Sequence, residues 1–423
     1  MRISTIQAFN SGVSGLQNNY ANLTRTQEQI STGNRILTPA DDPVASVRLL
    51  QLEQQQNVLG QYQSNLTAAQ NSLNQEEVTL NSVNSVLQRV RELTVQAGNG
   101  ALSQSDRQSI SAELAEREDE LLGLMNTRNA RGEYLFSGFQ GKTQPFVRNP
   151  DGSYQYQGDD GQRKLLVASS LELPISDSGR AVFETATNAG RLSVSGTPAG
   201  TISGALVDDE VSFANFPQFG VQLDFDATDP MNYTLRPITT PGTPGPPATP
   251  PVLGAAINGR LAEGKDTLVH YNGSAFYVNG TPPAASSFTL QGPDANPLTP
   301  PDSKVGILNT IASLRKALAS GTDSPQGNRD VRDAVALGIT NLDNGIGLVD
   351  ETRGKIGARL NVVDSTQTDN EDVSLVNKSI QADLRELDYA EALSRLSFQS
   401  IILEAAQQSY VKISGLNLFN QMG

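Results

Sequence analysis

Proline divides this chain of 423 residues into three stretches. Nineteen of the 22 prolines lie from Pro145 to Pro301, none lies between Pro43 and Pro145, and none follows Pro325. Because a proline inside a helix costs about 3 kcal/mol, its absence permits long helices near both ends and its density forbids them in the middle. The sequence therefore predicts a mainly α protein with a β-rich insert, which would form an outer β domain.

The first 30 residues carry apolar side chains at alternating spacings of three and four, as in a coiled-coil seam. Gly33 ends this seam, and Asp42 followed by Pro43 is the usual start of a helix, an N-cap and a first helical residue. We therefore expect a second helix over 43–97. The first seam consists of Ile6, Phe9, Val13, Leu16, Tyr20 and Leu23.

Three further helices are expected. Ser105 and Gln108 predict a capping box that opens a third helix reaching about Arg131. A short helix over 303–319 and a long apolar-periodic run to Phe419 follow the insert. Since an isolated amphipathic helix is unstable in water, helices from the two termini are expected to pair in a long antiparallel helical bundle or coiled coil.

The insert predicts short strands. Tyr154 and Tyr156 alternate with polar residues, and residues 163–168 follow a turn, which predicts a hairpin. Further strand-like stretches include 213–225, and the proline-dense run 237–251 predicts an extended linker that divides the insert into two lobes. The expected domains are a terminal assembly domain (1–40 and 378–423), a helical bundle (41–141 and 302–377) and the β insert (142–301).

Composition excludes several classes of function. With 31 Lys+Arg against 45 Asp+Glu the formal net charge is −14, which argues against binding to nucleic acid or an anionic membrane. Cysteine is absent and His270 is the only histidine, so disulfides, thiolate zinc sites and multi-histidine metal sites are excluded. No catalytic residue, cofactor or metal ligand is predicted. No apolar run has the length of a signal peptide or a membrane span, so we expect a soluble chain without a cleaved export signal.

Both ends are nearly free of charge. Residues 1–30 contain only Arg2, Arg25 and Glu28 as charges, and residues 405–423 contain only Lys412. Neutral polar faces can be buried against other chains without desolvating unpaired ions, so both ends are predicted to be assembly surfaces. The alternative is a frayed two-helix coiled coil within the monomer. The C-terminal candidates are Leu403, Tyr410, Ile413, Leu416, Leu418 and Phe419; those at the N-terminus are the six residues of the first seam.

Four stretches of the chain resemble the flagellin superfamily of bacterial flagellar axial proteins. They are the opening seam with residues 31–36, then 41–45, 129–138 and 388–394. Within this superfamily the N-terminus, residues 134–139 and the tail over 407–420 are more similar to the hook-associated proteins than to flagellin. The resemblance covers about 1–170 and 303–423.

This resemblance implies a non-enzymatic structural subunit of the bacterial flagellum, an adaptor at the hook–filament junction. It implies secretion by the flagellar type III export apparatus to an extracellular location. The partners it implies are hook-associated protein 1, flagellin, other copies of the chain and a flagellar export chaperone. The alternatives are a flagellin filament subunit and, from another class, a secreted adhesin or carbohydrate-active protein.

Several motifs invite a chemical interpretation that we do not favour. Residues 138–143 look like a phosphate-binding loop, but Phe136 stands where such a loop needs glycine, so we expect a turn. Asp41 and Asp42 are expected to cap a helix instead of forming a catalytic pair. The acidic run 369–372 lacks the spacing of a calcium loop and is expected to be solvated surface. His270 is expected to be structural or exposed.

Overall fold

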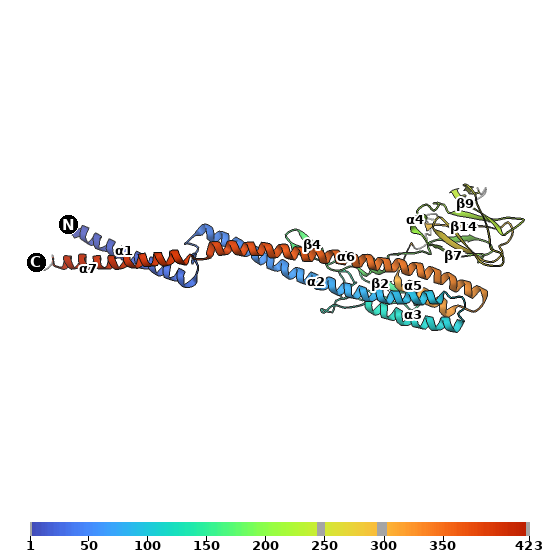
Figure 1. Cartoon of the computed structure of the whole chain (residues 1–423), viewed down its shortest axis with the longest axis horizontal. Helices are drawn as coiled ribbons and strands as arrows, with labels where there is room; N and C mark the ends of the chain where they lie inside the picture. Colours follow the sequence, from blue (N-terminus) through green and yellow to red (C-terminus); the bar gives the residue numbers. More distant parts are fainter. Residues whose placement is uncertain (1, 243–249, 294–302, 420–423) are drawn as a thin grey trace. The chain divides into compact units, whose positions relative to one another are not determined.

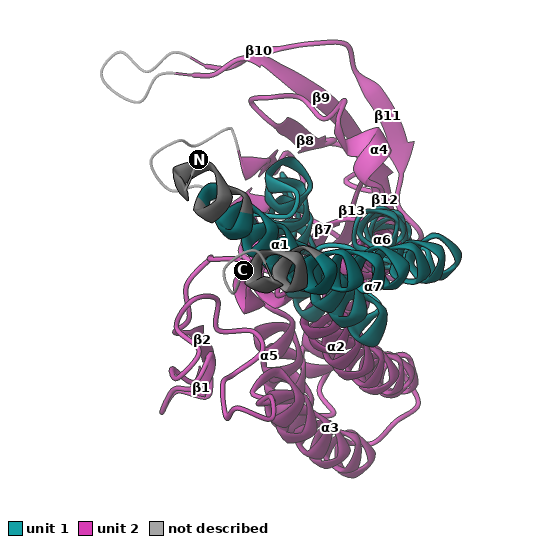
Figure 2. Ribbon diagram, turned by 90° about the vertical axis from the view of Figure 1, so that its left-hand side faces the viewer, with its two compact units in different colours: residues 1–66, 166–171, 364–423 teal, residues 67–165, 172–363 magenta. Residues whose placement is uncertain are grey.

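The computed structural model describes residues 2–242, 250–293 and 303–419 of the chain (Figure 1). Its contacts define two compact units, coloured separately in Figure 2. Unit 1 consists of 1–66, 166–171 and 364–423, and unit 2 of 67–165 and 172–363. Long terminal helices and a β-rich middle region are present, so the predicted fold class is confirmed.

In unit 1 the two terminal helices, α1 (Arg2–Thr32) and α7 (Tyr389–Phe419), lie side by side (Figure 1). They run antiparallel, because the ring of Phe9 lies 5.3 Å from that of Tyr410, whereas Arg395 donates to Gln29 Oε1 at 3.3 Å near the other end of the pair. Gly33, at φ +72°, follows α1 and turns the chain, as the sequence predicts.

The long helices α2 (Pro43–Ala97) and α6 (Pro325–Arg385) each contribute to both units. The predicted bounds of α2 are confirmed, and Asp42 caps it by accepting the N–H of Ala45 at 3.0 Å. The C-terminal run is two helices instead of one, since it breaks between Arg385 and Tyr389. The N–H of Arg35 donates to Arg385 O at 2.8 Å. The turn between α1 and α2 therefore lies beside the turn between α6 and α7.

In unit 2 the helices α3 (Gln104–Met125) and α5 (Ile307–Ser320) pack together beside α2 and α6. The predicted start and end of α3 are wrong. The capping box is formed by Ser103 and Asp106, and the helix ends at Met125 because the Asn126 side chain exchanges two hydrogen bonds with the backbone of Phe146. The core of the bundle contains Leu73, Leu80, Leu87, Leu93, Leu114, Leu121, Ile311, Leu314, Leu342, Val349 and Ile356.

Short strands connect α3 to α5. The first part of this connection contains two small hairpins and a π-helical turn, η1 (Arg180–Glu184). It ends with strand β5 (Ala186–Thr187), which pairs with β15 (Lys304–Val305). The hairpins pair β1 (Phe146–Arg148) with β2 (Tyr154–Tyr156) and β3 (Lys164–Ala168) with β4 (Leu171–Pro174).

The second part forms two antiparallel sheets over a common core of Leu192, Val207, Leu223, Phe276 and Phe288. The larger sheet has the order β10-β9-β8-β14-β6, with β11 on β9, and the smaller has the order β12-β13-β7. The bounds are β6 (Ser193–Gly196), β7 (Ile202–Val207), α4 (Glu210–Phe213), β8 (Val221–Phe225), β9 (Asn232–Thr240), β10 (Val252–Leu253), β11 (Ile257–Arg260), β12 (Thr267–Tyr271), β13 (Ser274–Val278) and β14 (Ser287–Gln291).

Three expectations for the insert are wrong. Tyr154 and Tyr156 pair with β1 and not with 163–168, which instead pairs with β4. The residues around Phe213 form the short helix α4, where Asp209 accepts the N–H of Val211. Prolines do not divide the insert near 237–251, because β9 and β10 pair across that segment within one sheet; residues 243–249 lie outside the described residues.

Candidate assembly interface

Unit 1 presents large apolar side chains to solvent along several helices. On α7, Phe398 is 66% exposed and Val411 is 68% exposed. At the start of α2, Val44 is 81% exposed. Because monomeric proteins rarely expose large apolar patches unless these bind something, this surface is the candidate functional site. The exposed residues of unit 1 include Tyr20, Val44, Val47, Leu50, Tyr389, Leu393, Phe398, Ile401, Ile402 and Val411.

The structure distributes the predicted assembly residues over two environments. Val13, Leu16, Leu23, Leu403 and Tyr410 are half-buried. Phe9 and Tyr20 are exposed, although Phe9 also contacts the ring of Tyr410. Phe9 and Tyr410 thus meet within one chain, and the role of the predicted set in assembly stays a prediction. The side chains of Ile6, Ile413, Leu416, Leu418 and Phe419 lie outside the described part of the chain.

Sequence reasoning left several exposed apolar residues out of the predicted assembly set. Phe398, Ile401 and Ile402 lie on α7 but outside the predicted set. The available signal was the run Ile401-Ile402-Leu403, because three consecutive apolar residues cannot all face one partner helix. The exposed Val47, on α2, gave no comparable signal.

Two ion pairs of unit 1 lie beside the turn between α1 and α2. Arg25 pairs with Asp41, and Arg35 pairs with Asp42 at 3.4 Å. Asp41 holds the turn before α2, since its carboxylate accepts the N–H groups of Leu37 and Thr38 at 2.9 and 3.0 Å. These backbone hydrogen bonds, that from Thr38 first, lower the pKa of Asp41. Asp41 therefore stabilises the turn before α2, and these hydrogen bonds account for the residue without a catalytic role.

The phosphate-loop-like segment binds a carboxylate of its own chain. The N–H groups of Phe139 and Gln140 donate to Asp159 at 2.9 and 3.1 Å, and that of Gly161 donates at 2.7 Å. These hydrogen bonds, with that from Phe139 first, lower the pKa of Asp159. The donors that a phosphate would need are already used, and the segment is a turn.

The remaining candidates offer no chemical site. His270 lies on β12 with Nδ1 2.9 Å from Asp208 Oδ2, in an exposed pair. Across the residues that the structure describes, no group of three metal-ligating side chains comes together. Within the same residues, no helix is long and apolar enough to cross a membrane.

Comparison with known proteins shows which class of protein this chain belongs to. Residues 3–141 match the family of the bacterial flagellin N-terminal helical region. Flagellar hook-associated protein 3 of Escherichia coli (strain K12) is 31% identical over 240 residues, which cover 56% of this chain and 75% of that protein. The chain is thus a flagellin-like protein of the flagellum, as its resemblance implies.

Solved structures agree with this relationship. The flagellar hook associated protein-3 from Legionella pneumophila has a TM-score of 0.62 at 26% identity, covering 79% of this chain and 98% of that one. The flagellar junction protein FlgL from Legionella pneumophila has a TM-score of 0.60 at 25% identity, covering 80% and 100%. This chain belongs to the flagellar hook-associated protein 3 family, a family of structural flagellar proteins.

Proposed function

We propose that the chain is a non-enzymatic adaptor that joins the flagellar hook to the filament through the exposed surface of unit 1. The observation that carries this proposal is the set of exposed apolar residues on α7 and on the start of α2, including Phe398 and Val44. Burying apolar surface releases about 25 cal/mol per Å², so such a surface favours binding to other subunits.

The proposed partners are hook-associated protein 1 on the hook side, flagellin on the filament side and other copies of the chain. A flagellar export chaperone would cover α7 before assembly, because Phe398, Ile401 and Ile402 are exposed in the single chain. The three-domain division predicted from the sequence, with 1–40 and 378–423 as the assembly domain, stays a prediction.

Deletion of the gene tests this function, with electron microscopy of the cells and an assay for flagellin in the medium. A junction adaptor predicts bare hooks and flagellin lost into the medium, both reversed by the wild-type gene. Bare hooks with no flagellin in cells or medium would identify the chain as a filament subunit instead. Normal filaments in a strain with no second copy of the gene would contradict both functions.

A further inference from the structure

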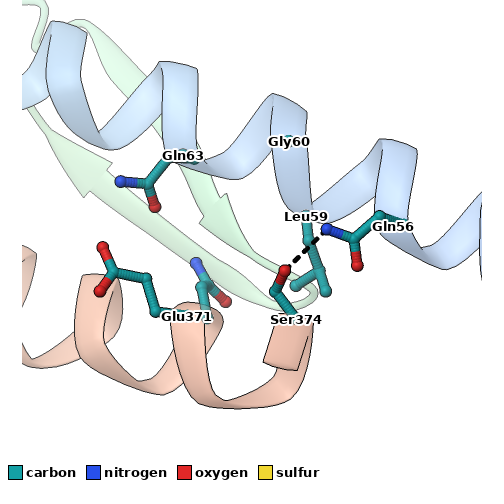
Figure 3. A pocket seen from close by; sticks show the side chains of 7 residues that line it. Gln56, Leu59, Gly60, Gln63, Glu371 and Ser374 are labelled. Carbon is teal, nitrogen blue, oxygen red and sulfur yellow. Dashed lines mark hydrogen bonds between the residues drawn. The ribbon is translucent and has the colours of Figure 1, made fainter. Parts of the chain in front are cut away.

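Side-chain amides of this chain are held by hydrogen bonds at many positions. In the groove between α2 and α6 of unit 1, Gln56 donates through Nε2 to Ser374 Oγ at 2.7 Å (Figure 3). Asn99, in the turn between α2 and α3, is different. Its side chain is exposed, and its Nδ2 donates to no acceptor among the residues that the structure describes. The next residue is a glycine, Gly100, and this pair is open to a chemical change that a held amide resists.

An asparagine that is followed by glycine readily loses ammonia in water, because asparagine is heat-labile and glycine has no Cβ to shield its backbone nitrogen. That nitrogen attacks Cγ of the asparagine. The new N–Cγ bond forms, the Cγ–Nδ2 bond breaks, and ammonia leaves with the proton of the glycine N–H. Water then opens the resulting succinimide at one of its two carbonyl groups and leaves aspartate or isoaspartate. Since the nitrogen must reach Cγ in the right orientation, the fold decides the rate.

The turn at Asn99 leaves both reacting groups available. Asn99 Oδ1 accepts the N–H of Ala101 at 3.1 Å, so the side chain is folded back along the Gly100 backbone. The N–H of Gly100 donates to no acceptor within the described part of the chain. A Cβ built on Gly100 would meet no heavy atom within 4 Å. The nitrogen can therefore approach Cγ, and ammonia can leave into solvent.

The other four asparagine–glycine pairs of the sequence lack this freedom. They are 258–259, 272–273, 279–280 and 344–345. In the third pair, Asn279 donates through Nδ2 to Gly200 O and Ser203 Oγ, both at 2.9 Å. The N–H of Gly280 donates to Asp266 at 3.0 Å. Both the leaving amide and the attacking nitrogen of this pair are thus held.

The remaining three pairs are held by secondary structure or by a hydrogen bond of the amide. Asn344 lies within α6, and its Nδ2 donates to Thr187 O at 2.8 Å. Asn272 donates through Nδ2 to Asn215 O at 3.2 Å. The pair 258–259 lies in β11, where both residues pair with β9. A backbone fixed in a helix or a strand cannot bring its nitrogen onto Cγ without local unfolding.

We propose that Asn99 is the position at which the folded chain deamidates first, to aspartate or isoaspartate. Loss of ammonia is irreversible in water, so the modified fraction grows with the age of the chain. The product carries a negative charge just beyond Ala97, the last residue of α2. Because the helix dipole disfavours an anion at a C-terminal end, the modification should loosen the last turn of α2.

Peptide mapping of the aged full-length protein tests the site. The folded chain is incubated at pH 8 and 37 °C in water enriched in oxygen-18, which labels only the asparagines that are hydrolysed during the incubation. Tandem mass spectrometry then locates the label; Asn99 is the only asparagine of the tryptic peptide 92–107. Label should appear at Asn99 at least about tenfold faster than at Asn258 or Asn344, which the fold holds out of reach. Equal rates at Asn99 and Asn258 would overturn the proposal.

Incubation in guanidinium chloride separates the effect of the fold from that of the sequence. In the unfolded chain the five pairs should react at rates within about threefold of one another, because no turn, strand or helix constrains them. A preference for Asn99 that stays unchanged in the unfolded chain would show that the fold does not select this position, and would also overturn the proposal.

The variant G100A tests the reaction itself. The added Cβ meets open space, so the fold should be kept, but it shields the attacking nitrogen. Label at Asn99 should therefore appear at least about tenfold more slowly than in the wild type. Amide hydrogen exchange in the last turn of α2 should become faster with age in the wild type and not in G100A. Unchanged labelling in G100A would contradict attack by the Gly100 nitrogen, and equal exchange in the two aged proteins would contradict the loosening of α2.

Discussion

Helix α2 shows the difference between the two units within one element. Over its unit 2 part the apolar seam, with Leu73, Leu80 and Leu87, is fully buried. Over its unit 1 part the seam residues Leu52 and Leu59 are only half-buried, and Val47 and Leu50, outside the seam, are 58% and 66% exposed. Both parts belong to one continuous helix, so the helical conformation does not depend on how deeply its apolar side chains are buried. What differs is the neighbourhood, because α3 and α5 pack only in unit 2.

This difference indicates how the protein divides its tasks. Unit 2 has its own core and buried polar network, and it can hold its fold as a single chain. Unit 1 has long helices with little apolar surface buried among its described residues, so we expect it to be the less stable unit in the single chain. The following predictions test this contrast, from the largest expected effect on stability to the smallest.

The largest effect is expected at the buried carboxylate of Glu118 in unit 2. This fully buried side chain accepts from Tyr154 at 2.6 Å, Arg148 at 2.8 Å and Arg315 at 2.7 Å. E118A removes the acceptor of Tyr154 and Arg315 and one of the two acceptors of Arg148, and should lower the free energy of unfolding by about 3–5 kcal/mol. Urea titration followed by circular dichroism measures it, and E116A is the exposed control, expected to change it by less than about 0.5 kcal/mol. A loss no larger for E118A than for the control would contradict the buried network.

Two truncations to alanine compare a buried position in the unit 2 part of α2 with an exposed position in its unit 1 part. L87A removes a fully buried side chain and should cost about 2–5 kcal/mol. V47A removes an exposed one and should change the free energy of unfolding by less than about 0.5 kcal/mol. The same titration checks both variants, and similar costs at the two positions would show that the contrast between units is wrong.

Glu76 gives unit 2 a dependence on pH. Burial, followed by the nearby Asp177, raises the pKa of Glu76 well above the usual 4.5. The folded chain thus holds a proton that the unfolded chain releases, so stability falls as pH rises above about 4.5 toward the folded pKa. Glu76 accepts the N–H of Asp177 at 3.1 Å. In E76Q the side-chain carbonyl can still accept that N–H, but the side chain no longer titrates, so the loss of stability with rising pH disappears.

Raising the pKa of Glu76 by one in the folded chain lowers the free energy of unfolding at high pH by about 1.4 kcal/mol. E76Q should therefore be more stable than the wild type at pH 8, with the gain shrinking toward pH 4.5. Urea midpoints of both proteins at these two pH values measure the gain. A gain that is the same at both values would mean that Glu76 does not titrate in this range.

A smaller and local effect is expected in unit 1. D42A removes the cap of α2, where Ala45 donates to Asp42 at 3.0 Å, and should cost that helix end about 1 kcal/mol. Amide hydrogen exchange should become faster over the first turn of α2 and stay unchanged in α3. Unchanged exchange at the start of α2 would show that the cap contributes nothing there.

Local rules in the sequence predict the long elements well. The absence of proline and the pair Asp42-Pro43 give the helix 43–97 with its true bounds, because capping and propensity act within a few residues. The pairing of β1 with β2 was missed, since a strand carries no mark of its partner when another candidate stands nearby in sequence. Nothing local in the sequence marks Glu76 as a buried titratable residue, because its partner Asp177 is distant in the chain.

The assembly surface stays a prediction. It rests on the low charge at both ends of the chain, where residues 1–30 contain three charges and residues 405–423 contain one. Periodicity favoured half-buried residues such as Leu16, because an apolar seam marks the face that a helix buries. The exposed residues Phe398 and Val47 lie outside that seam, and only a structure shows which faces are left after the chain has packed on itself.

The most direct test introduces F398D into the deletion strain and measures both folding and filament formation. Phe398 is 66% exposed, so the purified variant should unfold at the wild-type urea midpoint. The cells should nevertheless have bare hooks, with flagellin and the variant both in the medium. V211D, at a side chain 82% exposed on α4, is the matched control and should give normal filaments. Normal filaments with F398D would contradict the claim that the exposed face of α7 is an assembly surface.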